Sequence, residues 1–222
     1  MKWTICDYAV LSASVNVTDD VIVHEKRSNV MDKKSLRQYI KEEKQRHTAT
    51  ELSLFDSRLF CRIVEHPRVK EAGTVLLYWS LPDEVDTHTL VESLAASGKT
   101  VLLPRVEGGT ELSLRRFTAV EDMERGAYGI LEPQGEEVSA EALAALMPHE
   151  ADGTEGEAAV VAIIPGVAFD AEGHRLGRGK GYYDRLLARL PKMHTIGLCY
   201  PFQYLDSVPA ENWDMAVDEV IS

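Results

Sequence analysis

The segment from residue 163 to residue 187 constrains this chain more than any other part of it. Its sequence is IIPGVAFDAEGHRLGRGKGYYDRLL, in which an apolar run ends at Pro165-Gly166 and a glycine-rich basic loop then opens into an amphipathic helix. Free backbone N–H groups and the helix dipole favour an anion at such a helix N-terminus. The segment therefore predicts a phosphate-binding loop in an enzyme that handles a phosphorylated nucleotide.

The loop GRGKGYYDR matches neither of two common phosphate motifs. It lacks GxxxxGK[ST] because His174 stands where the first glycine would be, and it lacks GxGxxG because Tyr182 stands at the third glycine. Its glycines alternate with Arg178 and Lys180, so the backbone can approach a polyphosphate that two cations neutralise. The alternative is a solvated basic loop. We favour the phosphate site, because basic residues at a helix N-terminus oppose the dipole.

The composition excludes several classes of protein. The 222 residues are 45% hydrophobic and 27% charged, which suits one soluble domain, and no apolar run approaches the roughly 20 residues of a membrane span. The formal net charge of −12 argues against nucleic-acid and membrane-surface proteins. Cys6, Cys61 and Cys199 form no CxxC or zinc spacing, and the histidines show no metal-binding pattern. We expect a monomeric, cytoplasmic protein that meets anionic ligands with a local basic cluster.

Residues 1–30 are weakly patterned and lack the basic and apolar regions of a signal peptide. Met31 is followed by Asp32, a helix-capping residue, and then by a run of good helix formers. We predict a single α/β domain over residues 31–222. Residues 1–30 are interpreted as an extension, either a non-native start before Met31 or a disordered segment.

The rest of the chain predicts alternating strands and helices. Helices are expected after Asp32, over 49–65, over 87–96 and after the glycine-rich loop. Strands are expected at 74–79, 100–103, 158–164, 195–200 and 215–221, with an edge strand at 112–117. An acidic surface segment at 133–157 contains a short helix near 139–146. This alternation favours a three-layer α/β/α, Rossmann-like fold with a mainly parallel sheet.

Four side chains near these segments need separate consideration, and three of them allow two interpretations from the residues alone. Tyr183 has the helical spacing of a core residue, whereas Tyr182 points elsewhere and either packs or stacks on a ligand ring. Asp184 either satisfies the helix dipole or binds Mg²⁺ against the phosphates. Arg105 follows Pro104 at a strand end and is either a ligand contact or a surface ion-pair partner.

Five stretches of the chain, taken in order, resemble one known family. They are KKSLR at 33–37, YWSLPDEVDT at 78–87, LLPRV at 102–106, PGVAFDAEGHRLGRGKGYYDR at 165–185 and WDMAVDEV at 213–220. Together they are similar to the motifs of the 5-formyltetrahydrofolate cyclo-ligases, also called 5,10-methenyltetrahydrofolate synthetases. A lone glycine-rich loop is a weak signal, whereas five motifs in the same order are specific.

The resemblance implies a ring closure that depends on ATP and Mg²⁺. The formyl oxygen of 5-formyltetrahydrofolate, with or without a polyglutamate tail, takes the γ-phosphoryl group, and N10 attacks the activated carbon. The products are 5,10-methenyltetrahydrofolate, ADP and phosphate. The resemblance also implies a topology shared with sugar-phosphate isomerases and CoA transferases.

The resemblance further implies roles for residues at matching positions. Arg178 and Lys180 would be catalytic, and Asp184 and Asp214 would bind Mg²⁺. Two segments would bind ATP, through Lys33, Lys34, Ser35, Leu36, Arg37, Arg175, Leu176, Gly177, Arg178, Gly179, Lys180, Gly181, Tyr182 and Tyr183. The folate substrate would contact Trp79, Glu84, Arg178, Gly179, Lys180, Gly181 and Tyr182.

A second function stays open at this point: a nucleotide- or sugar-phosphate-binding module of the same fold without ligase activity. By position alone, Trp79 is typical of a core residue and Asp214 of a turn. The presence of both, together with Glu84 and Asp184, favours the enzyme, because a plain anion-binding module needs no such acids.

Overall fold

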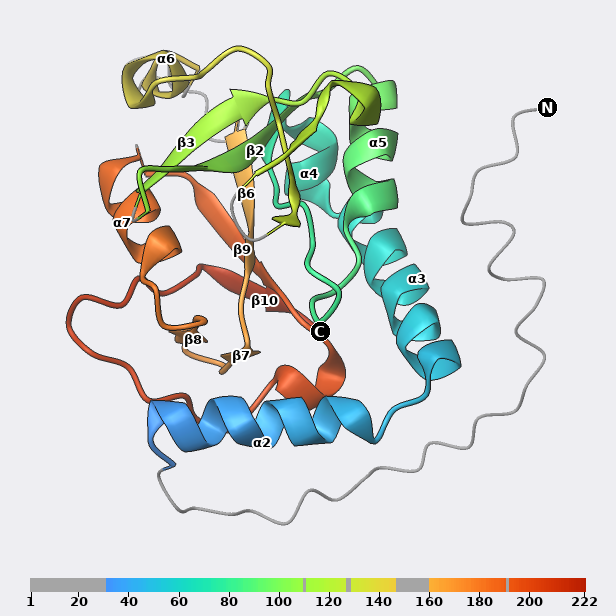
Figure 1. Ribbon diagram of the computed structural model, residues 1–222, viewed down its shortest axis with the longest axis vertical. Coiled ribbons are helices and arrows are strands. Elements are labelled where there is room, and N and C mark those ends of the chain that lie inside the picture. The colour runs from blue at the N-terminus through green and yellow to red at the C-terminus, as the bar shows by residue number, and fades with distance from the viewer. Residues whose placement is uncertain (1–30, 110, 127–128, 147–159, 191) are drawn as a thin grey trace.

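A central sheet of six strands organises the fold (Figure 1). The computed structural model describes residues 31–109, 111–126, 129–146, 160–190 and 192–222, so the predicted extension over residues 1–30 lies outside the described residues. The strand order is β10-β9-β6-β1-β2-β3, and every neighbouring pair is parallel except β2 with β3. The strands are β1 Thr74–Leu76, β2 Thr100–Glu107, β3 Glu111–Arg116, β6 Val160–Pro165, β9 His194–Leu198 and β10 Glu219–Ile221.

Helices lie on both sides of the sheet (Figure 1). They are α2 Lys33–Gln45, α3 Ala49–Glu65, α4 Pro67–Glu71, α5 His88–Ala96, α6 Ala140–Ala144 and α7 Tyr182–Arg189, with the 3₁₀ turns η1 Val120–Asp122 and η4 Pro201–Gln203. Two small hairpins pair β4 Glu124–Arg125 with β5 Leu131–Glu132, and β7 Ala168–Phe169 with β8 Arg175–Leu176. Among the described residues, no helix is long and apolar enough to cross a membrane.

Successive residues of the central strands point into two separate cores. In β6, Ile163 packs with residues of α3, α4 and α5, whereas Ile164 packs with residues of α6 and α7. Both side chains are fully buried. Since neighbouring residues of a strand face opposite sides, each apolar face of the sheet requires its own layer of helices. The predicted three-layer α/β/α fold with a mainly parallel sheet is confirmed.

The helix starts follow the capping chemistry of the sequence. The Asp32 carboxylate accepts a hydrogen bond from the Ser35 amide at 2.7 Å and so caps α2. Thr48 and Glu51 form a reciprocal capping box at the start of α3. The helix predicted at 49–65 has the bounds of α3, and the one predicted at 87–96 begins one residue later, at His88.

Strand β2 is longer than predicted, because Pro104 does not end it. Its parallel pairing with β1 stops at Leu102, so the amide that proline lacks is not needed on that side. The antiparallel pairing with β3 continues to Glu107. The predicted edge strand is confirmed as β3, which begins at Glu111 and ends at Arg116.

Strands β1 and β10 are shorter than predicted. At one end of each predicted segment, the backbone bonds to a side chain or to a loop instead of to a neighbouring strand. Beyond β1, the Tyr78 carbonyl accepts a hydrogen bond from the Thr87 hydroxyl at 2.6 Å instead of a strand neighbour. Before β10, the Val217 amide bonds to Gly173 at 2.9 Å, outside the main sheet. Both departures lie at ends of the segments predicted as strands.

The strand that precedes the glycine-rich loop does not lead into it directly, since the β7–β8 hairpin lies between them. Asp170, Glu172 and His174 come together at its turn in a group that resembles a cation site. The buried Asp170 carboxylate already accepts backbone N–H groups of Glu172, His174 and Val208. The group is therefore explained as the closure of a turn.

Part of the acidic segment lies against the sheet rather than away from it. The Arg116 amide donates to Glu136, and the Val138 amide donates to Leu114, along the outer edge of β3. The short helix predicted near 139–146 is α6, capped by the Ser139 hydroxyl. Residues 147–157 of this segment lie outside the described residues.

The order of the strands reverses beside β1. The chain passes from β1 to β2 and β3 on one side, and then crosses to β6, β9 and β10 on the other. The carboxyl ends of β1 and β6 therefore diverge at a topological switch point, the usual position of ligand sites in open α/β sheets.

The two-core arrangement makes a prediction about Ile163, which is fully buried at the centre of β6. We expect Ile163→Ala to lower the free energy of unfolding by about 2–5 kcal/mol, because it removes buried methyl groups and leaves a cavity. Chemical denaturation measures the change. Leu54→Ala on α3, where the side chain is 45% exposed, is the control and should cost about 0.5 kcal/mol or less. Equal losses in the two variants would contradict the packing described.

Candidate functional site

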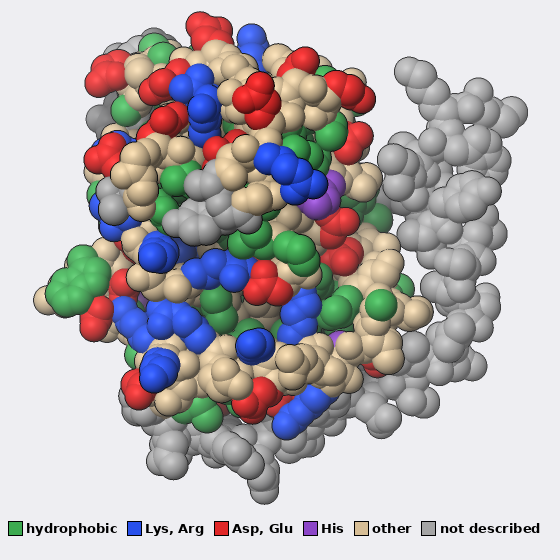
Figure 2. Space-filling view, viewed as in Figure 1, with side chains coloured by type: hydrophobic (Ala, Val, Ile, Leu, Met, Phe, Trp, Pro, Cys, Tyr) green, Lys and Arg blue, Asp and Glu red, His purple; other side chains and the backbone are tan. Residues whose placement is uncertain are grey.

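A cavity of about 500 Å³ lies between α2 and the carboxyl ends of β1, β6 and β9. Its lining residues are Arg37, Ile40, Lys41, Lys44, Gln45, Leu52, Asp83, Glu84, Gly166, Val167, Arg178 and Gln203. Figure 2 shows Lys and Arg side chains gathered on the face of the molecule between α2 and α7. A chain with a net charge of −12 thus carries a local basic cluster beside its cavity.

Helix α2 is joined to distant parts of the chain beside this cavity, through partners that do not themselves line it. The Arg37 Nε atom donates to the Gly177 carbonyl at 2.8 Å, which connects α2 to the glycine-rich loop. The Lys33 ammonium forms ion pairs with Asp214 at 2.6 Å and with Glu211 at 2.9 Å. Three of the segments singled out in the sequence therefore meet in one place.

Two residues of the glycine-rich loop have backbone conformations that favour glycine. Gly179 and Gly181 have φ angles of +93° and +64°, which residues with a Cβ rarely adopt. A Cβ on Gly179 would also lie 3.4 Å from the Arg37 guanidinium. Gly181 is the N-cap of α7, and no side chain caps the first amides of this helix. The loop therefore presents the helix N-terminus that phosphate binding uses.

Lys180 and Arg178 differ in their surroundings. Lys180 is exposed, and in the described part of the chain its ammonium forms no hydrogen bond or ion pair. Arg178 donates through Nε to Glu84 at 3.0 Å and forms a second ion pair with Asp83. Burial opposes the charged form of Asp83, but the Arg178 guanidinium outweighs it and lowers the pKa of that carboxyl. Arg178 thus connects the loop to the segment after β1.

The predicted metal ligands, Asp184 and Asp214, lie close to each other. Oδ1 of Asp184 accepts hydrogen bonds from Arg175 at 2.6 Å and from the amide of Met215, the neighbour of Asp214, at 3.2 Å. Burial opposes the charge on Asp214, but the Lys33 ammonium outweighs it and lowers the pKa. The second oxygen of each carboxylate has no hydrogen bond among the described residues, so one ligand atom of each is available.

Several predicted site residues point away from the cavity. Leu36 and Leu176 are buried in the core, and Lys34 and Ser35 are exposed on α2. Tyr183 packs against both cores, as its spacing predicted.

Two aromatic residues of the predicted site have protein partners instead. The Tyr182 hydroxyl donates to the Gly109 carbonyl at 2.8 Å. Trp79 packs on His88, with ring centroids 4.2 Å apart, and does not line the cavity. Arg105, for which two roles were open, does not line the cavity either; it forms the ion pair, with Glu107 at 3.7 Å, and donates to Gln134 at 3.0 Å.

The cavity also contains residues that the motifs did not indicate. Lys41 and Lys44 follow Arg37 at intervals of four and three along α2, so a basic face at helical spacing was the available signal. Burial lowers the pKa of Lys44. Asp83 lies within the motif at 78–87, beside Glu84, but no role was assigned to it, and Gln203 lies outside all five motifs.

The chain is similar to known proteins over most of its length. A model of the 5-formyltetrahydrofolate cyclo-ligase family matches residues 29–222. The mouse 5-formyltetrahydrofolate cyclo-ligase is 28% identical over 198 residues, which are 85% of this chain and 92% of the mouse protein. The Haemophilus influenzae cyclo-ligase is 31% identical over 68% of this chain and 76% of its own length.

A solved structure is also similar to this chain. The 5,10-methenyltetrahydrofolate synthetase of Aquifex aeolicus superimposes with a TM-score of 0.69 at 34% identity, covering 86% of this chain and 89% of that one. The family match spans all the segments that surround the cavity. The chain belongs to the 5-formyltetrahydrofolate cyclo-ligase family.

Proposed function

We propose that this protein converts 5-formyltetrahydrofolate and ATP into 5,10-methenyltetrahydrofolate, ADP and phosphate. Family membership supports the reaction. The observation that carries the assignment of the site is a single cavity in which Arg37 of α2, Arg178 of the glycine-rich loop and Glu84 lie together. Such a cavity lets two substrates meet, as a phosphoryl transfer between them requires.

The nucleotide phosphates are proposed to lie between α2 and the glycine-rich loop. The N-terminus of α7 supplies backbone N–H groups, and Lys33, Arg37 and Arg175 supply positive charge nearby. Lys180 is the most available cation of the loop, because its ammonium has no partner among the described residues. Its proposed role is to neutralise charge on the transferring phosphoryl group.

The folate is proposed to lie on the Glu84 side of the cavity. The Glu84 side chain is 14% exposed and accepts hydrogen bonds, so it suits the N–H donors of a pterin ring. Arg178 of the glycine-rich loop bonds to Glu84 and so connects this acid to the proposed phosphate site. Trp79 and Tyr182 are engaged with His88 and Gly109, so direct contact with substrate would require them to move.

The chemistry divides into two steps. The formyl oxygen attacks the γ-phosphorus, an O–P bond forms, and the bond between that phosphorus and ADP breaks. N10 then attacks the formyl carbon and loses its proton, and phosphate leaves with the former formyl oxygen. The proposed work of Arg178 and Lys180 is to orient the two substrates and to stabilise the negative charge that moves between them.

Asp184 and Asp214 are the proposed ligands of Mg²⁺. They fit this ion because two carboxylates from separate segments lie close together, each with one oxygen not used in a hydrogen bond. When bound, Mg²⁺ would neutralise part of the charge on the phosphates. We further propose a monomeric, cytoplasmic enzyme; Cys61 and Cys199, the cysteines among the described residues, form no disulfide, which is compatible with a reducing compartment.

The rival function is a phosphate-binding module without ligase activity. A module that only binds phosphate would not need the carboxylates of Asp83 and Glu84, which form ion pairs with Arg178 in the cavity. Mixing the protein with ATP, Mg²⁺ and 5-formyltetrahydrofolate should produce the near-ultraviolet absorbance of the methenyl product. Reactions without ATP are the control. Absence of any ATP-dependent absorbance gain would sink the proposed activity and leave the binding module.

Replacing the cation of the loop should impair catalysis without unfolding the protein. We expect Lys180→Ala to lower kcat by about 10²–10³, the usual cost of one group that stabilises transition-state charge. The exposed position of Lys180 predicts an unchanged melting temperature. Lys192→Ala, which removes another exposed lysine, is the matched control and should retain full activity. A folded Lys180→Ala protein with normal kcat would remove Lys180 from the mechanism.

Asp214→Asn should weaken the binding of Mg²⁺. We expect the Mg²⁺ concentration that gives half-maximal activity to rise about tenfold or more, because a neutral amide is a weaker ligand than a carboxylate. Asp206→Asn, at an exposed position outside the cavity, is the control. A Mg²⁺ titration identical to that of the wild type would show that Asp214 is not a ligand.

A further inference from the structure

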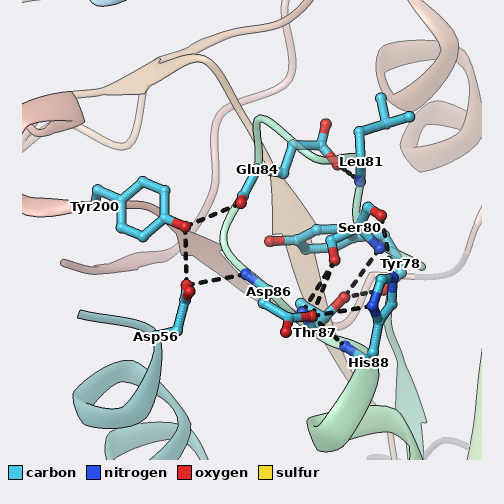
Figure 3. A network of polar contacts seen from close by, with 9 residues as sticks. All are labelled: Asp56, Tyr78, Ser80, Leu81, Glu84, Asp86, Thr87, His88 and Tyr200. Atoms are coloured by element: carbon cyan, nitrogen blue, oxygen red, sulfur yellow. Dashed lines mark hydrogen bonds and ion pairs between the residues drawn. The ribbon is translucent and has the colours of Figure 1, made fainter. Parts of the chain in front are cut away.

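The segment that carries Glu84 is held by hydrogen bonds between its own residues, both at its two ends and at its tip. Between β1 and α5, the Ser80 and Thr87 amides each bond to the side chain of the other residue, at 3.2 and 3.1 Å. At its tip, the Glu84 amide bonds to the Leu81 carbonyl and the Leu81 amide bonds to Glu84 Oε2, both at 3.0 Å. Figure 3 shows this network. The Glu84 carboxylate therefore moves together with the backbone of its own turn.

A buried tyrosine from another strand bonds to that backbone. Tyr200 follows β9, is 2% exposed, and donates through its hydroxyl to the Glu84 carbonyl at 3.0 Å. The same hydroxyl oxygen lies 2.9 Å from Asp56 Oδ1 on α3 (Figure 3), so the two acceptors share its single proton. Asp56 Oδ1 also accepts the Asp86 amide at 3.0 Å. Tyr200 and Asp56 thus bond to the backbone at Glu84 and at Asp86, two residues later.

The ring of Tyr200 is fixed by its neighbours. It stacks on Phe202 at 5.4 Å between centroids and contacts Phe55 at 6.2 Å. The Lys44 ammonium, which lines the cavity, lies 4.9 Å from the centre of this ring. A ring packed in this way has little freedom to move, so its hydroxyl is a rigid donor. The proposed binding contacts do not use this hydroxyl.

We propose that Tyr200 and Asp56 are positioning residues that fix Glu84 for the folate substrate. This inference rests on the proposed function, since it takes Glu84 as a folate contact. Without the hydroxyl, the partly buried Glu84 carbonyl loses its partner, and the turn relaxes. The carboxylate then loses its place opposite Arg178, to which it bonds at 3.0 Å.

Tyr200→Phe tests the proposal, because it removes only the hydroxyl and keeps the ring that Phe202 and Lys44 contact. We expect KM for 5-formyltetrahydrofolate to rise about five- to tenfold, as for loss of one hydrogen bond, with KM for ATP within twofold of the wild type. Asp56→Ala should act in the same direction. Tyr204→Phe, the same change at a side chain that is 42% exposed, is the control and should alter neither constant.

A double-mutant cycle separates positioning from general loss of structure. Glu84→Gln alone should also raise KM for the folate, and adding Tyr200→Phe to it should raise KM no further, because Tyr200 acts through Glu84. The proposal is overturned by an unchanged folate KM in Tyr200→Phe, by additive effects in the cycle, or by equal losses for both substrates together with a lower melting temperature.

The proposed function has its own readout in the same experiment. If the wild type shows no turnover, the cyclo-ligase activity fails, and the dissociation constant of 5-formyltetrahydrofolate measured by calorimetry replaces KM in the cycle. If the wild type is active and Tyr200→Phe behaves like it, the positioning role alone fails.

Discussion

The cavity exists because α2 is held across the carboxyl ends of the strands. Two polar contacts fix it there, from Arg37 to the Gly177 carbonyl and from Lys33 to Asp214. Contacts of this kind at a partly exposed surface contribute about 1 kcal/mol or less each. Burial of Leu36 and Ile40 on the inner face of the helix adds the apolar part of the attachment. Apolar burial binds the helix to the domain, and the polar contacts set its position over the loop.

This placement explains how an acidic protein can bind anions. The basic groups of α2 and of the glycine-rich loop converge on one cavity, and the acids Asp83 and Glu84 face Arg178 across it. The positive charge of Arg178 is therefore already neutralised by these two carboxylates before a substrate binds. Within the glycine-rich loop, Lys180, without a partner among the described residues, is the group whose charge is most available to a ligand.

Much of the fold followed from the sequence, because its signals are local. Capping residues and helical spacing predicted α3 in its bounds, and alternating apolar segments predicted the parallel sheet. Pro104 misled the prediction of β2, since a proline interrupts a strand only where its missing amide is needed. The order of the motifs predicted the family, but not which residues face the cavity. Tyr182 carries the right residue type yet bonds to Gly109.

The contribution of Tyr200 and Asp56 could not have been predicted in the same way. Their contacts with the Glu84 turn join α3, the end of β9 and the segment after β1, which are distant in sequence. No local pattern marks a tyrosine that bonds to a backbone carbonyl 116 residues earlier. Such groups are found only when the tertiary structure is known.

Both substrates are proposed to bind together between α2 and the strand ends. A crystal structure of the protein with ADP, Mg²⁺ and 5-formyltetrahydrofolate would test this. We expect phosphates against residues 177–181 with Mg²⁺ at Asp184 and Asp214, and a pterin ring bonded to Glu84. A folate or nucleotide bound elsewhere, for example at the amino ends of the strands near His66 and His194, would contradict it.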